Sequence, residues 1–288
     1  MSNKDSIQKD NSFLIRLRTG VILVIVAIAA IVLGGYVLWG VLLAVSMIGL
    51  MELYRAVGVH KSPAAFAGYA AAAAWYGLLL WKEILTDDAV FPYSAAFPVL
   101  IAAFIVILLA VYVFAFPKYN SEQITMVFFG FFYVALTLSY IFLVRGLPGG
   151  KYTVWLIFIG SWGADTMAYV VGRSIGKHKI VPVLSPKKSL EGFIGGVLGA
   201  VLIGVIYALI FKNSLTAEFP NPVFSFTVIA ACSSVVSMIG DLAASAIKRD
   251  KQIKDYGKLL PGHGGILDRF DSVIFIAPIV YYLLYFGI

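Results

Sequence analysis

The sequence predicts an all-α membrane protein, a polytopic bundle of about nine transmembrane helices that forms a single membrane-embedded domain over residues 1–288. Hydrophobic residues occupy 61% of the 288 positions and charged residues only 13%, whereas soluble domains carry roughly 25% charged residues. Apolar runs of about 20 residues, the length of a helix that crosses a bilayer, recur along the chain. Lipid is therefore the expected solvent for most of this protein.

The expected spans follow from these apolar runs. The first two runs are separated only by Gly34, Gly35 and Tyr36, with no charged loop, so one long kinked element is an alternative to two spans there. The runs lie at residues 13–33, 37–56, 64–85, 95–116, 124–145, 152–172, 190–211, 223–246 and 271–287.

The distribution of positive charge predicts the orientation. Lys and Arg favour cytoplasmic loops, and nine spans with the N-terminus inside place most of the 22 basic residues in cytoplasmic segments. The net charge of +7 is therefore read as loop charge at a cell membrane, with no nucleic acid as partner. Residues 1–150 are expected to pack and to contribute to a homodimer. Residues 151–288 carry two polar cytoplasmic loops, at about 173–189 and 247–270, and are expected to hold the site.

A carboxylate within the sixth predicted span is the first candidate site residue. Asp165 follows Gly160-Ser161-Trp162-Gly163-Ala164, and a charged side chain at the bilayer centre costs about 2.5–3.5 kcal/mol on insertion scales. Asp165 must therefore face the bundle interior and find a cation, water or a proton. A neutral acid that makes only a packing hydrogen bond is the structural alternative.

Paired lysines precede the seventh predicted span, in Ser185-Pro186-Lys187-Lys188-Ser189-Leu190-Glu191-Gly192. Helix N-termini and ammonium groups both attract anions, and Ser189 is suited to cap the helix. The stretch predicts a phosphate-binding element, with a membrane-surface anchor as the alternative.

The densest polar stretch surrounds the eighth and ninth predicted spans. Asp241, Ser245 and Lys248 are spaced to share one helix face, as are Asp268 and Asp271. Arg249 and Arg269 add positive charge, and the glycine-rich turn at 262–265 would let backbone N–H groups approach a phosphate. His263, within this turn, is expected to donate to phosphate or to order the loop. A solvated loop with salt bridges is the alternative.

Carboxylates without a Cys or His cluster suit Mg²⁺, which commonly takes one or two carboxylates together with substrate phosphates. Carboxylates flanked by Lys and Arg are also the arrangement that phosphoryl-type transfer requires, because the positive groups neutralise charge on the phosphate oxygens. The sequence therefore predicts a magnesium-dependent site for a phosphorylated substrate.

The same residues carry a resemblance to a known family. The stretch from Ser245 to Asp271, S-A-I-K-R-D-K-Q-I-K-D-Y-G-K-L-L-P-G-H-G-G-I-L-D-R-F-D, resembles the signature of phosphatidate cytidylyltransferases, the CDP-diacylglycerol synthases. The Asp165 region and the stretch from Ser185 to Gly192 are also similar to that family. The resemblance covers about residues 155–275.

The resemblance implies the reaction of CTP with phosphatidic acid to give CDP-diacylglycerol and pyrophosphate, with Mg²⁺ as cofactor and the phospholipid bilayer as the setting. Asp241 and Asp268 would hold the metal, with Asp165 and Asp271 as further candidates. The expected catalytic residues are Asp241, Lys248, Arg249, Asp268 and Asp271. The expected phosphate-binding residues are Lys187, Lys188, Ser189, Ser245, His263, Gly264 and Arg269.

Two other functions remain open at this stage. Another lipid phosphotransferase would use the same chemistry, although the DGxxAR-type stretch of CDP-alcohol phosphotransferases is absent. An ion-coupled transporter would use Asp165 as the coupling acid, but transporters often show paired broken helices in two halves, and here the polar groups lie only in the C-terminal half.

Overall fold

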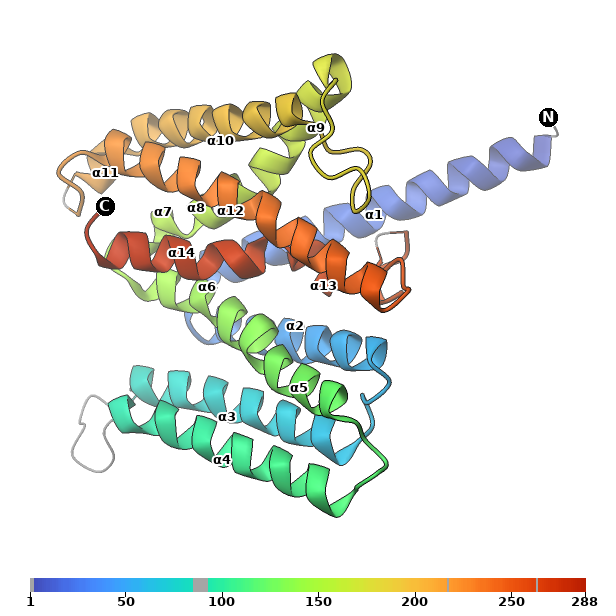
Figure 1. Ribbon diagram of the computed structural model, residues 1–288. Coiled ribbons are helices and arrows are strands. Elements are labelled where there is room, and N and C mark those ends of the chain that lie inside the picture. Colours follow the sequence, from blue (N-terminus) through green and yellow to red (C-terminus); the bar gives the residue numbers. More distant parts are fainter. Residues whose placement is uncertain (1–2, 85–92, 217, 263) are drawn as a thin grey trace. The chain divides into compact units, whose positions relative to one another are not determined.

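The computed structural model describes residues 3–84, 93–216, 218–262 and 264–288, and its regular elements there are helices (Figure 1). Seven of them are long and apolar enough to cross a membrane, and two further apolar helices, at Arg18–Leu33 and Val273–Tyr285, are shorter. The all-α polytopic bundle predicted from composition is thus confirmed. The count of nine spans is not confirmed by length and composition alone.

The chain divides into two compact units, and the division does not follow the sequence order. Unit 1 comprises residues 1–139 and 253–269, and unit 2 comprises residues 140–252 and 270–288. Part of the predicted catalytic loop therefore belongs with the N-terminal helices. The interpretation as a single domain stays a prediction.

Unit 1 is built from helices of the N-terminal half. They are α1 (Asn3–Leu33), α2 (Gly35–Ala56), α3 (Pro63–Ile84), α4 (Tyr93–Phe114), α5 (Ser121–Gly130), the π-helical segment η1 (Phe131–Leu136) and the start of α6 (Thr137–Gly146). The chain between α1 and α2 is broken at Gly34 and Gly35, whose φ angles of 63° and 45° are left-handed. The two helices contact one another, and the choice between two spans and one long kinked element stays a prediction.

Unit 2 contains α7 (Gly150–Thr153), α8 (Trp155–Phe158), the π-helical segment η2 (Ile159–Gly163), α9 (Ala164–Ile175), α10 (Leu190–Ile210), α11 (Lys212–Leu215), α12 (Pro222–Asp250) and α14 (Val273–Tyr285). The run from Gly150 to Ile175 is long and apolar enough to form one span. The four-residue helix α13 (Leu267–Phe270) lies at the boundary between the units in the sequence.

Local capping explains where two of these helices begin. Ser189 is the N-cap of α10, where its hydroxyl oxygen accepts a hydrogen bond from the Gly192 N–H at 3.2 Å, as predicted. Asn221 caps α12 in the same way, and Pro222 occupies the first turn, where no N–H partner is needed. α12 continues to Asp250, four residues beyond the predicted end at 246.

Helices α9 and α10 pack with little space between their backbones, and α10 also runs beside α12 (Figure 1). The contact face of α10 carries glycines. A Cβ on Gly196 would lie 2.9 Å from the Ala164 carbonyl oxygen and 3.0 Å from the Ala168 Cβ. Since apolar side chains gain little by leaving lipid for one another, such small residues allow the close van der Waals contact that stabilises membrane helices.

The interior of unit 1 is organised around buried tyrosines with satisfied hydroxyls. Tyr54 of α2 is fully buried and donates a hydrogen bond to the Val127 carbonyl oxygen of α5 at 2.9 Å. A Cβ on Gly130 would lie 2.7 Å from the Tyr54 ring. Tyr76 of α3 shares a 2.8 Å hydrogen bond with Ser46 of α2. These bonds pair polar groups that would otherwise be unsatisfied in an apolar interior.

The α9–α10 contact should be intolerant of one added methyl group. Gly196→Ala is expected to lower the unfolding free energy by about 1–3 kcal/mol because two backbones must separate. Gly77→Ala is the matched control, since its Cβ meets nothing within 4 Å, and it should be neutral or slightly stabilising. Thermal unfolding of both variants in detergent checks this. Equal midpoints would show that the close contact contributes no stability.

Candidate functional site

Unit 2 brings together charged residues from separate predicted motifs. The Lys188 ammonium, in the loop before α10, forms a 2.6 Å ion pair with Oδ2 of Asp241 on α12. Asp165 at the start of α9 interacts electrostatically with both. Asp165 is exposed in the structure. An exposed carboxylate inside an apolar span beside other charges indicates a polar, water-accessible face of the bundle.

Asp271 joins the same cluster from the segment that precedes α14. It interacts electrostatically with Asp241 and Asp165. It also interacts with Lys248, which lies on the same face of α12 as Asp241, about two turns further along the helix. Burial and the neighbouring Asp241 carboxylate raise the pKa of Asp271 to about 7. Three carboxylates and two lysines thus gather in unit 2, and the repulsion between the acids favours a bound cation.

Close packing between α12, η2 and the segment before α14 holds these acids near one another. A Cβ on Gly240 would lie 3.1 Å from the Asp271 carbonyl oxygen, so the glycine beside Asp241 lets the Asp271 segment approach α12. Ser272 shares a buried 2.7 Å hydrogen bond with Ser161 in η2. π-Helical turns inside α-helices occur frequently at functional sites, and η2 ends two residues before Asp165.

The other predicted residues of unit 2 lie nearby in sequence but have different surroundings. Ser245 lies on α12 between Asp241 and Lys248 and is partly buried. Lys187 and Arg249 are exposed. Ser189 is buried as the α10 cap, so its hydroxyl has a structural partner. Their predicted roles in phosphate binding and catalysis stay predictions.

In unit 1, the predicted ligand Asp268 is engaged with the backbone. Its Oδ2 accepts hydrogen bonds from the N–H groups of Tyr256 and Gly265, both at 2.9 Å, and the side chain is 7% exposed. Asp268 and Asp271 do not share one continuous helix, because α13 ends at Phe270 and α14 begins at Val273. Metal binding by Asp268 stays a prediction.

The remaining predicted residues of the glycine-rich turn also fall in unit 1. Gly264 has a left-handed φ of 82°, and the backbone N–H of Gly265 is directed to Asp268. Arg269 is exposed. His263 lies outside the described residues. In the described part, the glycines of this turn make room for a carboxylate of the protein itself.

The sequence analysis missed one carboxylate, Glu52 on α2. It is 1% exposed and accepts hydrogen bonds from the N–H groups of Ile266 and Leu267 at 3.1 and 2.9 Å. Glu52 could have been found in the sequence in the same way as Asp165, as an acidic residue inside an apolar run. The hydrogen-bond partners lie more than 200 residues away in the sequence, and no spacing rule connects them.

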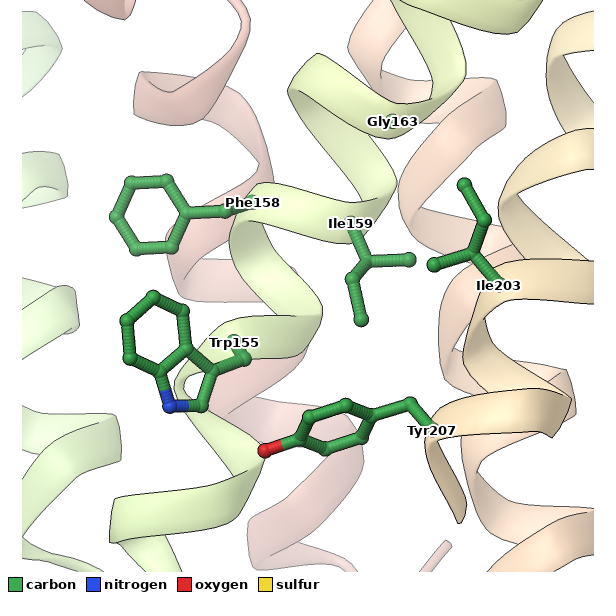
Figure 2. A pocket seen from close by; sticks show the side chains of 6 residues that line it. All are labelled: Trp155, Phe158, Ile159, Gly163, Ile203 and Tyr207. Carbon is green, nitrogen blue, oxygen red and sulfur yellow. The ribbon is translucent and has the colours of Figure 1, made fainter. Parts of the chain in front are cut away.

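An apolar cavity of about 340 Å³ opens beside η2 (Figure 2). Ile159 and Ile203 point toward one another across it, and Trp155, Phe158, Gly163 and Tyr207 complete its lining. Its residues come from α8, η2 and α10. The same helical run continues directly into Asp165, so the apolar cavity adjoins this member of the charged cluster along the chain.

The charged cluster offers carboxylate oxygens, which are the donor atoms that a hard divalent cation prefers. In the described part of the chain, no three Asp, Glu, His or Cys side chains are placed closely enough to hold a metal together. One or two carboxylates are nevertheless what Mg²⁺ commonly takes from a protein, with water and substrate phosphates as its other ligands. Asp241, with Asp165 or Asp271, provides such a set, and Lys188 and Lys248 stand beside it.

Comparison with known proteins places the chain among enzymes of one type. A family model described as the cytidylyltransferase family matches residues 14–286. The phosphatidate cytidylyltransferase of Bacillus subtilis (strain 168) is 33% identical over 275 residues, which cover 93% of this chain and 96% of that protein. The phosphatidate cytidylyltransferase of Thermotoga maritima is 40% identical over 149 residues, 52% of this chain and 54% of that protein.

The acidic cluster generates a prediction that needs no activity assay. Mg²⁺ should raise the thermal unfolding midpoint of the detergent-purified protein at constant ionic strength, because a ligand present at 100 times its Kd stabilises by about 2.7 kcal/mol. Asp241→Asn should abolish most of this shift. Asp250→Asn, which changes an exposed acid near the end of the same helix, should retain it. An undiminished shift in Asp241→Asn would place the cation elsewhere.

Proposed function

The chain belongs to the cytidylyltransferase family, and we propose from this premise that it is a phosphatidate cytidylyltransferase that makes CDP-diacylglycerol from CTP and phosphatidic acid. The similarity to the B. subtilis enzyme extends over nearly the whole of both chains. The observation that carries the proposal is the cluster of Asp165, Asp241, Asp271, Lys188 and Lys248, which supplies the charges that a nucleotidyl transfer between two phosphates requires.

The reaction needs little acid–base chemistry. An oxygen of the phosphatidate phosphate attacks the α-phosphorus of CTP and forms a new P–O bond. The bond from the α-phosphorus to the bridging oxygen breaks, and pyrophosphate leaves with the electron pair. Because the phosphatidate phosphate is already ionised at pH 7, catalysis consists mainly of positioning and charge neutralisation.

The proposed roles follow from this balance. Lys188 and Lys248 bind phosphate oxygens and offset the repulsion between two polyanionic substrates. Lys187 and Arg249, both exposed, extend the positive charge available to CTP, and the phosphate-binding role of Arg269 in unit 1 is kept as a prediction. Asp241 together with Asp165 or Asp271 would hold Mg²⁺. When bound, Mg²⁺ would neutralise phosphate charge as a Lewis acid. The ligand role of Asp268 that the family resemblance implies is kept as a prediction.

The membrane setting follows from the same description. The protein is a multi-pass membrane protein with several apolar helices of spanning length. We propose that the charged cluster faces the cytoplasm, because most Lys and Arg residues fall in segments that the positive-inside rule assigns to that side. CTP would then reach the site from the cytoplasm while phosphatidic acid arrives from the bilayer. Homodimer formation through the N-terminal helices stays a prediction.

The apolar cavity beside η2 provides a place for one acyl chain of phosphatidic acid. The cavity is continuous along the chain with the charged cluster, because its lining residues Ile159 and Gly163 lead directly into Asp165. A lipid whose phosphate lies at the charged cluster could lay a chain against Trp155, Phe158 and Ile203 without leaving the bundle.

Pyrophosphate release tests the proposed reaction. Protein purified in detergent should release pyrophosphate only when CTP, phosphatidic acid and Mg²⁺ are all present. Asp241→Asn should lower the rate at least 100-fold, about 2.7 kcal/mol of transition-state stabilisation. Asp250→Asn should retain the wild-type rate. A well-folded wild-type protein that releases no pyrophosphate would refute the proposal and return attention to ion-coupled transport through Asp165.

Chain-length dependence tests the cavity. Ile203→Trp should fill it and raise the KM for long-chain phosphatidic acid several-fold, while the KM for a dihexanoyl substrate stays near the wild-type value. Leu202→Trp, at an exposed position of the same helix, is the control and should change neither constant. If Ile203→Trp affects both substrates equally, the cavity does not hold the acyl chain.

A further inference from the structure

Glu52 is a buried carboxylate with no part in the reaction described above. It lies near the end of α2, in the N-terminal half of the chain, for which the sequence predicts only packing and a homodimer contact. Oε1 accepts a hydrogen bond from the Ile266 N–H at 3.1 Å, and Oε2 accepts one from the Leu267 N–H at 2.9 Å. The side chain is 1% exposed. Both donors precede Asp268 directly in the sequence.

We propose that Glu52 is a positioning residue, which clamps the 256–267 segment and so fixes the placement of Gly264, Asp268 and Arg269. The inference rests on the proposed function only in assigning those three residues to substrate or metal binding. The clamp itself lies entirely within unit 1. It gives the N-terminal helices a role in shaping the loop that carries Asp268, in addition to packing.

The segment is shaped to receive the Glu52 side chain. A Cβ on Gly257 or on Gly265 would collide with the Glu52 carboxylate. Both glycines are therefore needed so that the loop backbone can lie directly against the acid from two sides. If Glu52 needed only hydrogen-bond donors for its own charge, the loop would not need glycines at two positions to make room for the carboxylate.

A second carboxylate completes the arrangement from within the segment. Oδ2 of Asp268 holds the N–H groups of Tyr256 and Gly265, and a Cβ on Gly264 would lie 2.9 Å from that oxygen. Consecutive N–H groups of Gly265, Ile266 and Leu267 thus all point to carboxylates. Displacing Glu52 removes the acceptors for two of them.

The alternative is that Glu52 only caps the short helix α13. Capping a four-residue helix would satisfy its first N–H groups, which water or a side chain of the same loop could also do. Glu52 instead belongs to a spanning helix, and an acid within such a helix is costly. The contact ties the conformation of the loop to the position of α2, and this is what the experiment distinguishes.

Glu52→Gln removes the clamp at almost constant volume. Glutamine has one acceptor oxygen, and its amide group would present donors to the second backbone N–H. Hydrogen exchange of peptides covering residues 256–267, measured by mass spectrometry on the full-length protein in detergent, should become at least tenfold faster. Exchange in α3 and α10 should stay unchanged. The kcat/KM for pyrophosphate release should fall at least tenfold.

Two controls separate the clamp from general damage. Glu218→Gln changes an exposed acid outside the site and should alter neither readout. Gly265→Ala, whose methyl group would displace the Glu52 carboxylate, should reproduce the faster exchange and the lower activity. In a Glu52→Ala background, Gly265→Ala should add little further loss, because residues that act as a unit are not additive.

Each outcome decides the inference. Unchanged exchange of the 256–267 segment in Glu52→Gln would overturn it, whatever happens to activity. Faster exchange with wild-type activity would also overturn it, since the clamp would then position nothing that matters to the reaction. If the wild-type protein releases no pyrophosphate, the proposed function fails, and the exchange result alone confirms or refutes the clamp.

Discussion

The constraint on which this structure depends is that every carboxylate within the apolar helices must find a partner. An acid held away from water pays a desolvation cost that only a cation or several hydrogen-bond donors can offset. In unit 1 the partners are backbone N–H groups of the 256–267 segment, held by Glu52 and Asp268. In unit 2 they are lysines, with Lys188 on Asp241 and Lys248 near Asp271.

Much of this arrangement was accessible from the sequence because it depends on local rules. Apolar runs located the spanning helices, Ser189 marked the start of α10, and the spacing of Asp241 and Lys248 placed them on one face of α12. Three features were not accessible. The π-helical segments η1 and η2 and the pairing of Ser161 with Ser272 depend on tertiary packing. The partners of Glu52 lie on a segment remote in sequence, which apolar periodicity cannot reveal.

The glycines show why residue type alone was an incomplete guide. A glycine-rich turn beside acids and bases predicts a backbone that approaches a phosphate. In the described residues, Gly257 and Gly265 make room for Glu52, and Gly264 makes room for Asp268. Close approach of these N–H groups to a phosphate stays a prediction. The anions in this structure are carboxylates of the protein, a distinction that sequence spacing does not encode.

The partner of each acid also distinguishes two roles, positioning a loop and binding a ligand. In the sequence both kinds of acid look the same, as a carboxylate in or beside an apolar run. An acid whose oxygens accept backbone N–H groups fixes the shape of a loop, and moving it would disorder that loop. An acid paired with a mobile lysine ammonium can exchange this partner for a cation or a phosphate-bound metal without disturbing the backbone. By this criterion Glu52 positions a loop within unit 1, and Asp241 is suited to bind a ligand within unit 2. Asp268, whose Oδ2 braces the loop that carries it, connects the two kinds, because any ligand it binds depends on the conformation that Glu52 maintains.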